Sequence, residues 1–176
     1  MRRAFTATCG LLWAVALVVV APPGAIAVPT LTVDVFEDTF DGSCDDRDCS
    51  LRDALAIVDV GGTVRVPPAS TPYRSRGGGP DAGDVDLDRP LRIVGIGETG
   101  SFLDASGLGD RVFDVDADVT LHHLALLNGA VGGAGGLVRV RSGAVEISDS
   151  SLVFGAARDG GAIAVGNRAT SPSLGR

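Results

Sequence analysis

The stretch Val112-Phe113-Asp114-Val115-Asp116 recurs as Leu137-Val138-Arg139-Val140-Arg141 and again as Ala162-Ile163-Ala164-Val165-Gly166, at a spacing of 25 residues. Within each copy, apolar residues alternate with polar or small ones, the period-2 pattern of a half-buried β-strand. The apolar positions form two columns, with Phe113, Val138 and Ile163 in one and Val115, Val140 and Val165 in the other. We therefore predict three equivalent strands whose columns face the core.

A second set of strands repeats beside the first. Val119-Thr120-Leu121 matches Val145-Glu146-Ile147 at a spacing of 26, and Gly-rich turns lie at 132–136 and 160–161. A unit of about 25 residues with a few short strands cannot bury an apolar face alone, so its copies must stack. Each strand would then pair in parallel with its equivalent in the next coil, about 4.8 Å away. The sequence thus predicts an all-β parallel β-helix, which is a solenoid.

The polar positions of the repeat favour the same alignment. Asp114 would lie beside Arg139 on the outer surface, where opposite charges attract. Asp116 would lie beside Arg141 in the same way. Exposed pairs of this kind contribute only about 0.2–1 kcal/mol each, so they indicate register more than stability. The less favoured alternative is an antiparallel β-sandwich, which also has short strands and Gly turns.

The first 27 residues have the layout of a secretory signal peptide. Arg2 and Arg3 precede an apolar run, Leu11 to Ala21, and Ala25-Ile26-Ala27 is a small-residue cleavage site. We predict cleavage before Val28. A retained anchor is the alternative, although the run is shorter than the roughly 20 residues that span a bilayer. Cleavage removes both N-terminal arginines and takes the net charge from −7 to −9, which argues against nucleic acid or anionic membranes as partners.

Export would remove Cys9 and leave Cys44 and Cys49 in an oxidising compartment. Two cysteines allow one bridge, which would close a tight loop around Asp45-Asp46-Arg47-Asp48; free thiols are the alternative. A calcium site formed by the loop aspartates and Asp41 is less favoured, because their spacing does not match an EF-hand. We therefore predict a disulfide, a solvated acidic turn and no metal.

Directly after the second of these cysteines, Ser50 and Asp53 have the spacing of a capping box at a helix start. The Ser50 hydroxyl can accept from the Asp53 N–H, and the Asp53 carboxylate can accept from the Ser50 N–H. A short apolar helix from Leu51 to Val58 would follow and end at Gly61-Gly62. The cysteine pair and this helix would together form a compact N-terminal cap.

The block Cys49-Ser50-Leu51-Arg52-Asp53-Ala54-Leu55, with its paired cysteines, resembles the CSLREA domain of bacterial exported proteins. That resemblance implies a right-handed parallel β-helix with the pectate-lyase-like fold, headed by a structural cap that includes Ser50, Leu51, Arg52 and Asp53. Three later stretches look like coils of the family: Leu91 to Gly97, Arg111 to Val115 and Leu124 to Gly129. Two departures are Asp53, where the family usually has Glu, and Phe154-Gly155, which lacks the Asn-x-Ala turn of an asparagine ladder.

These signals divide the chain into a signal peptide (1–27), a cap (28–62), a strand with an irregular excursion (63–90) and β-helix coils (91–176). The excursion, from Pro67 to Pro90, is rich in Gly, Pro, Arg and Asp. The residues from Asn167 to Pro172 abandon the repeat pattern. An open last coil leaves an unpaired edge that is prone to association. We therefore expect a truncated product, or one that a partner or a second copy caps.

The residues indicate no catalytic constellation. The acids of the coils are scattered, and the arginines aligned with Asp114 and Asp116 fit surface pairing better than acid–base chemistry. His122 and His123 are adjacent on a strand and would point to opposite faces, so they would not chelate one metal. Asn128-Gly129 is a turn signal. We expect no cofactor and no enzyme activity.

The expected function is therefore that of a structural or adhesive module at the bacterial surface or outside the cell. One flat sheet face would bind an extracellular glycan or protein. The first alternative is a polysaccharide lyase or hydrolase, because proteins with the pectate-lyase-like fold include such enzymes. The second alternative is a non-functional fragment of a longer surface protein.

Overall fold

The computed structural model describes residues 29–45, 47–68, 73–74, 83–97, 100–169 and 173–175, so the predicted signal peptide lies outside the described residues. The strands form three sheets, which we call A, B and C. Sheet A contains, in spatial order, β1 (Thr30–Thr32), β2 (Thr63–Val66), β5 (Leu91–Gly95), β8 (Val119–His122), β11 (Val145–Ser148) and β14 (Ser173–Gly175). Sheet B contains β3 (Tyr73–Arg74), β6 (Ser101–Asp104), β9 (Leu124–Leu127) and β12 (Ser151–Val153). Sheet C contains β4 (Val85–Leu87), β7 (Phe113–Val115), β10 (Val138–Gly143) and β13 (Ile163–Ala169).

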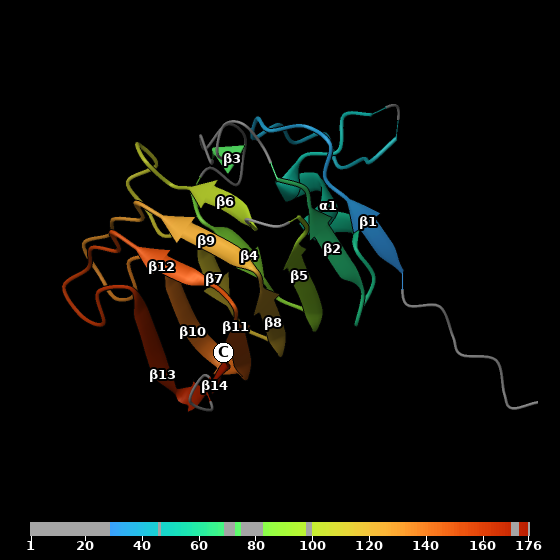
Figure 1. Ribbon diagram of the computed structural model, residues 1–176. Coiled ribbons are helices and arrows are strands. Elements are labelled where there is room, and N and C mark those ends of the chain that lie inside the picture. Colours follow the sequence, from blue (N-terminus) through green and yellow to red (C-terminus); the bar gives the residue numbers. More distant parts are fainter. Residues whose placement is uncertain are drawn as a thin grey trace, which may run out of the picture.

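From β2 onward the chain visits sheets A, B and C in turn, so that it winds as a solenoid (Figure 1). Each strand pairs with its equivalents in the neighbouring coils, and the pairings between the described strands are parallel. A β-sandwich would require antiparallel neighbours. The predicted parallel β-helix is therefore confirmed, and the sandwich alternative is wrong.

The register of sheet C is the one that the repeat predicts. Phe113 pairs with Val138, which pairs with Ile163, and the second apolar column pairs in the same order. The columns differ in burial along the stack. Phe113, Val115, Val138 and Val140 are fully buried, whereas Ile163 is half-buried and Val165 is 41% exposed. This difference arises because β13 is the outermost strand of sheet C in the described part of the chain, so its side chains are covered from one direction.

The prediction of an irregular excursion between the cap and the coils is wrong for the residues of β4, which form a regular strand. Val85 pairs with Phe113 and Leu87 with Val115, so β4 is a further copy of the strand repeat. The copy was not evident in the sequence because its spacing to β7 is 28 residues instead of 25. The other strand expected in this segment, β2, is present.

The two ends of the chain also follow the solenoid more closely than predicted. In the segment assigned to the cap, β1 pairs with β2 and extends sheet A, so cap and coils share one sheet. The C-terminal segment expected to abandon the pattern contains the end of β13, up to Ala169, and β14 then pairs with β11. A backbone ladder therefore continues where the side-chain pattern no longer signals it.

Helix α1 (Leu51–Ile57) lies at one end of the stack beside β2 (Figure 1). Its apolar side buries Ala54, Leu55 and the C-cap residue Val58 in the same core as the strand columns. The predicted helix start is confirmed, and the helix ends one residue before the predicted Val58. Among the described residues, no helix combines the length and hydropathy that crossing a membrane requires.

Candidate functional site

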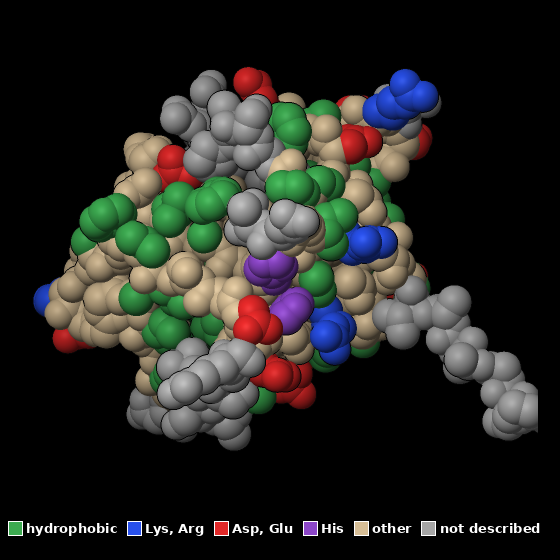
Figure 2. Space-filling view, viewed as in Figure 1, with side chains coloured by type: hydrophobic (Ala, Val, Ile, Leu, Met, Phe, Trp, Pro, Cys, Tyr) green, Lys and Arg blue, Asp and Glu red, His purple; other side chains and the backbone are tan. Residues whose placement is uncertain are grey.

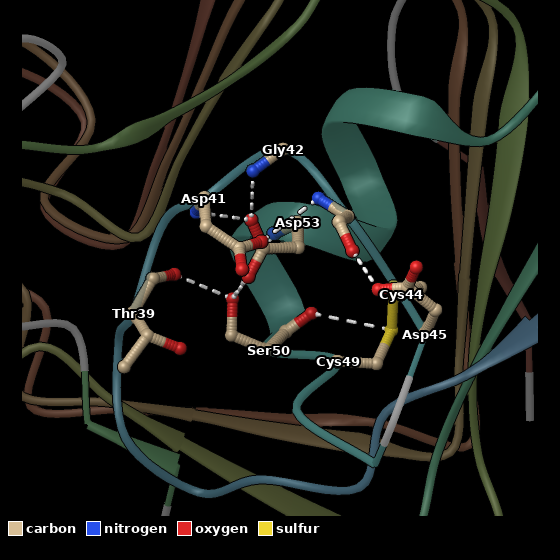
Figure 3. Close-up of a disulfide and its surroundings, with 9 residues drawn as sticks. Thr39, Asp41, Gly42, Cys44, Asp45, Cys49, Ser50 and Asp53 are labelled. Carbon is tan, nitrogen blue, oxygen red and sulfur yellow. Dashed lines mark hydrogen bonds between the residues drawn. A yellow bond between two sulfur atoms is a disulfide. The ribbon is translucent and has the colours of Figure 1, made fainter.

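The cap motif begins with a hydrogen-bonded helix start. Ser50 is the N-cap of α1, and its Oγ accepts the Asp53 N–H at 3.0 Å, as predicted. The Asp53 carboxylate departs from the predicted capping box. It accepts the backbone N–H groups of Asp41 and Gly42, at 3.0 and 2.9 Å, and lies 2.6 Å from the Ser50 hydroxyl (Figure 3). The buried carboxylate thus holds a loop that lies earlier in the chain.

The disulfide lies beside this helix start. Cys44 and Cys49 are bonded, with their Cα atoms 4.2 Å apart, so the predicted bridge is present (Figure 3). Directly before the bridge, Ser43 donates its N–H to Asp41 and its hydroxyl to Asp45, the first residue of the loop that the bridge closes. Asp46 lies outside the described residues. Across the described part of the chain, no three His, Cys, Asp or Glu side chains are placed to hold a metal ion.

Replacing both Cys44 and Cys49 by Ala should lower the free energy of unfolding by about 2 kcal/mol. Short loops gain least from a disulfide, because little chain entropy is removed from the unfolded state. Chemical denaturation of the oxidised protein and of the double variant measures the difference. The reduced wild-type protein is the matched control and should resemble the variant. Equal midpoints for all three samples would show that the bridge does not stabilise the cap.

Arg52 connects the helix to the solenoid. Its guanidinium donates to the Asp38 carboxylate at 3.0 and 3.2 Å and to the backbone carbonyls of Gly83 and Asp84 at 2.9 and 3.4 Å. The side chains of Arg52 and Asp38 are only 7% and 8% exposed. Leu51 packs partly buried against the core. Through Ser50, Arg52 and Asp53, one helical turn holds the loop before the helix and the residues before β4 together.

The outer face of sheet C bears a ladder of charges, as predicted. Arg139 donates to Asp114 at 3.0 Å, and Arg141 pairs with Asp116. The expectation that both pairs are exposed is wrong for Asp114, which is 3% exposed. Asp114 lies among three guanidiniums, those of the buried Arg111 and of Arg139 and Arg141, each 3.5 Å or less from its carboxylate.

The ladder extends to Asp84, the residue before β4. Arg111 Nη1 lies 2.6 Å from the Asp84 carboxylate and 3.5 Å from Asp114. Burial raises the pKa of Asp84 above the ordinary value of 3.8, and the hydrogen bond from Arg111 partly opposes that rise. Because its folded-state pKa is raised, Asp84 opposes folding above that pKa, and this opposition fades as the pH falls towards 3.8. These carboxylates are engaged by arginines, as structural ion pairs are.

The outer face of sheet B differs from those of sheets A and C in the kind of side chain that it presents to solvent. Outward positions carry Arg65, Arg92 and Glu146 on sheet A and the charge ladder on sheet C. On sheet B the outward column Phe102, Ala125 and Ser151 lies beside the outward pair Leu127 and Val153. In Figure 2, apolar side chains gather over β6, β9 and β12.

This face is hollowed by a groove of about 290 Å³. Phe102, Leu127 and Val153 line it together with His123, Asp149 and Ser151. At the same face, Asp104 is buried and accepts from Asn128 Nδ2 at 2.8 Å and from the Ser106 N–H and hydroxyl at 2.9 Å each. The lining of the groove itself has an apolar floor and a polar end formed by His123, Asp149 and Ser151, which is the usual composition of a ligand site.

The prediction that the two histidines point to opposite faces is wrong. Their ring centroids are 6.0 Å apart, and both rings lie on the face shown in Figure 2. The reason is the backbone of His123, which has a φ of 56° and turns the chain out of β8. His122 Nδ1 lies 3.0 Å from Ser148 Oγ and 3.5 Å from the Asp149 carboxylate.

Sheets B and C meet at a similar turn in two successive coils. Asn128 has a φ of 58°, which confirms the predicted turn, and Phe154 takes the equivalent position with a φ of 57°. Phe154 cannot donate the side-chain hydrogen bond that Asn128 makes, and its ring is exposed. The absence of the Asn-x-Ala signal at this coil therefore corresponds to a turn made without an amide side chain.

Sequence reasoning found the residues of the cap and of the core columns, and missed those of the groove. Phe102 alternates with buried neighbours like any strand residue, so nothing in its local pattern marks it. A usable signal would have been the apolar character of the outward positions on β9 and β12. The chain matches no protein-family model, no curated protein and no solved structure.

Proposed function

We propose that the chain is an exported bacterial β-solenoid that acts as a binding module and engages its ligand through the outer face of sheet B. The observation that carries this proposal is the contrast between the three faces. Sheets A and C present charged side chains to solvent, whereas sheet B presents an apolar, hollowed surface. Exposed apolar surface of this kind commonly marks an interaction site.

Export is supported by the layout of residues 1–27 and by the disulfide, since such bonds persist in oxidising compartments. The resemblance of residues 49–55 to the CSLREA domain supports a place at or outside the cell surface. The intact mass of the secreted protein tests this part. We expect the mass of the chain from Val28 less two hydrogens, and a mass that includes the N-terminal arginines would contradict cleavage.

Binding is tested with the full chain, produced with its N-terminal segment in an exporting bacterium. The secreted protein is applied to arrays of glycans and of extracellular proteins. We expect saturable binding to at least one class, and we expect Phe102→Ala to weaken it. Binding to neither class, or binding that Phe102→Ala leaves unchanged, would contradict the assignment of sheet B as the ligand face.

A further inference from the structure

We propose that the groove on the outer face of sheet B binds a neutral pyranose unit of a glycan. This inference rests on the proposed function, since it names the ligand class of the same face. A sugar ring is amphipathic: its C–H faces pack on apolar surface while its hydroxyls need hydrogen-bond partners. The groove offers apolar side chains for the C–H face and polar groups for the hydroxyls. Its volume of about 290 Å³ is suited to a small part of a glycan.

The apolar wall centres on Phe102. Its side chain is 38% exposed, and its neighbours in register along the outer face are the small residues Ala125 and Ser151. Small neighbours leave room beside the aromatic ring. Leu127 and Val153 continue the floor in the adjacent column. Aromatic rings provide a large apolar contact area at a low cost in conformational entropy, which suits a platform for a sugar face.

The polar end consists of corner residues of successive coils. His123 and Asp149 have φ values of 56° and 47° and stand where the chain leaves β8 and β11. His and Asp tolerate this left-handed conformation better than most residues. The backbone turn places both side chains along the groove, where Ser151 adds a hydroxyl. Together they supply acceptors and a donor for sugar hydroxyls.

Two contacts hold these polar groups in place before a ligand arrives. A Cβ atom added at Gly100 would lie 3.0 Å from Cδ2 and 3.3 Å from Nε2 of His123, so the His123 ring packs against the Gly100 backbone. The Asp149 carboxylate lies 3.5 Å from His122 Nδ1. Groups that are already oriented lose less entropy on binding. His123 and Asp149 therefore each have a contact within the protein before a ligand binds.

The charge of the groove selects among glycans. Of the described residues that line it, Asp149 carries a carboxylate and none is Lys or Arg. The whole chain has a net charge of −7. A polyanionic glycan would meet repulsion from Asp149, with no arginine among the described lining residues to offset it. A neutral sugar, which needs an acceptor for its hydroxyls, fits the carboxylate.

The face also fits a sugar better than an added peptide strand. Strand addition uses the unpaired N–H and C=O groups at a sheet edge. In β6 and β9 those groups are engaged in the ladders of sheet B. The edge that strand addition could use is that of β12, at the end of the stack, whereas the groove lies on the sheet face, where side chains contact a ligand. A ligand that recognises side chains on a sheet face is therefore the better match.

The test titrates the full secreted chain with neutral oligosaccharides (cello-, manno- and malto-series) and, in parallel, with oligogalacturonate, by calorimetry. We expect saturable binding of at least one neutral series and none of the acidic one. Phe102→Ala and Asp149→Asn should each weaken binding at least tenfold; Asn keeps the tolerance for the left-handed backbone at this corner. Phe40→Ala is the matched control, because Phe40 is equally exposed, at 39%, but lies in the cap, and it should bind as the wild type does.

The possible results distinguish an error in the ligand class from an error in the assignment of sheet B as the binding face. If no neutral series binds while an extracellular protein binds in a manner that depends on Phe102, the sugar proposal is overturned and the binding face stands. If a neutral sugar binds but both groove variants retain full affinity, this groove is not its site, and the assignment of the face falls as well. Binding of oligogalacturonate in preference to the neutral series would overturn the proposal on charge.

Discussion

Replacing Val140 by Asp is expected to unfold the solenoid. Val140 is fully buried and lies between Val115 and Val165 in one inward column of sheet C. A carboxylate at this position would be surrounded by apolar side chains, and burial of an unpaired charge costs several kcal/mol after relaxation. Since a domain of this size has about 5–15 kcal/mol of stability in total, that cost removes most or all of it. Circular dichroism and thermal melting of the secreted variant measure the loss.

Val165→Asp is the matched control for this prediction. It makes the same chemical change in the same column, but Val165 is 41% exposed. An added carboxylate there remains hydrated, so we expect a folded protein with a midpoint close to that of the wild type. A Val140→Asp variant that melts as the wild type does would show that the column does not face the core. Unfolding of both variants would show that burial is not what distinguishes the two positions.

The contrast between these positions also shows which parts of the fold the sequence could reveal. The repeat gave the register, because residues at equal spacing must pair once the coils stack. It could not give the burial of each copy, since burial depends on what covers a coil from both directions. Phe113 and Ile163 are equivalent in sequence, yet the first is fully buried and the second is half-buried.

Deviations from equal spacing explain the strands that were missed. β4 follows the same pattern as β7, but three extra residues separate them relative to the later copies. An insertion in a corner changes the spacing without changing the pairing, because the loop that holds it lies outside the ladder. A search restricted to one period therefore finds the regular coils and overlooks the first.

The groove was beyond sequence reasoning for a different reason. Its polar end depends on the left-handed backbone of His123 and Asp149, which redirects two side chains that a regular strand would place elsewhere. Similarly, the burial of Asp114 does not follow from the repeat, because Arg111, which contacts it, lies outside the alternating positions of the strand. Both differences between sequence and structure occur where the chain leaves the ideal strand, because there a corner residue determines what surrounds the neighbouring side chains.

The cap motif allows the second large effect to be predicted. Arg52→Met keeps most of the side-chain volume and removes the charge, so Asp38 loses its guanidinium partner and the carbonyls of Gly83 and Asp84 lose a donor. Breaking a buried ion pair by removing one partner typically costs about 3–5 kcal/mol. We expect a loss in this range, measured by denaturation, with amide exchange rising first in α1 and in the residues before β4.

Arg158→Met serves as the control, because it removes a guanidinium that is paired at the surface, with a side chain 78% exposed beside a 67% exposed Asp159. Surface pairs contribute about 0–1 kcal/mol, so this variant should lose far less stability than Arg52→Met.

A further comparison separates the contribution of the Arg52–Asp38 charge pair from that of the carbonyl contacts. In Arg52→Met combined with Asp38→Asn, no buried carboxylate is left at position 38, so the double variant should be less destabilised than the sum of the two single variants. Additive losses would mean that Arg52 stabilises the cap through the carbonyls of Gly83 and Asp84, with the Asp38 pair contributing little. A loss equal to that of Arg158→Met would mean that the helix is not tied to the solenoid through Arg52.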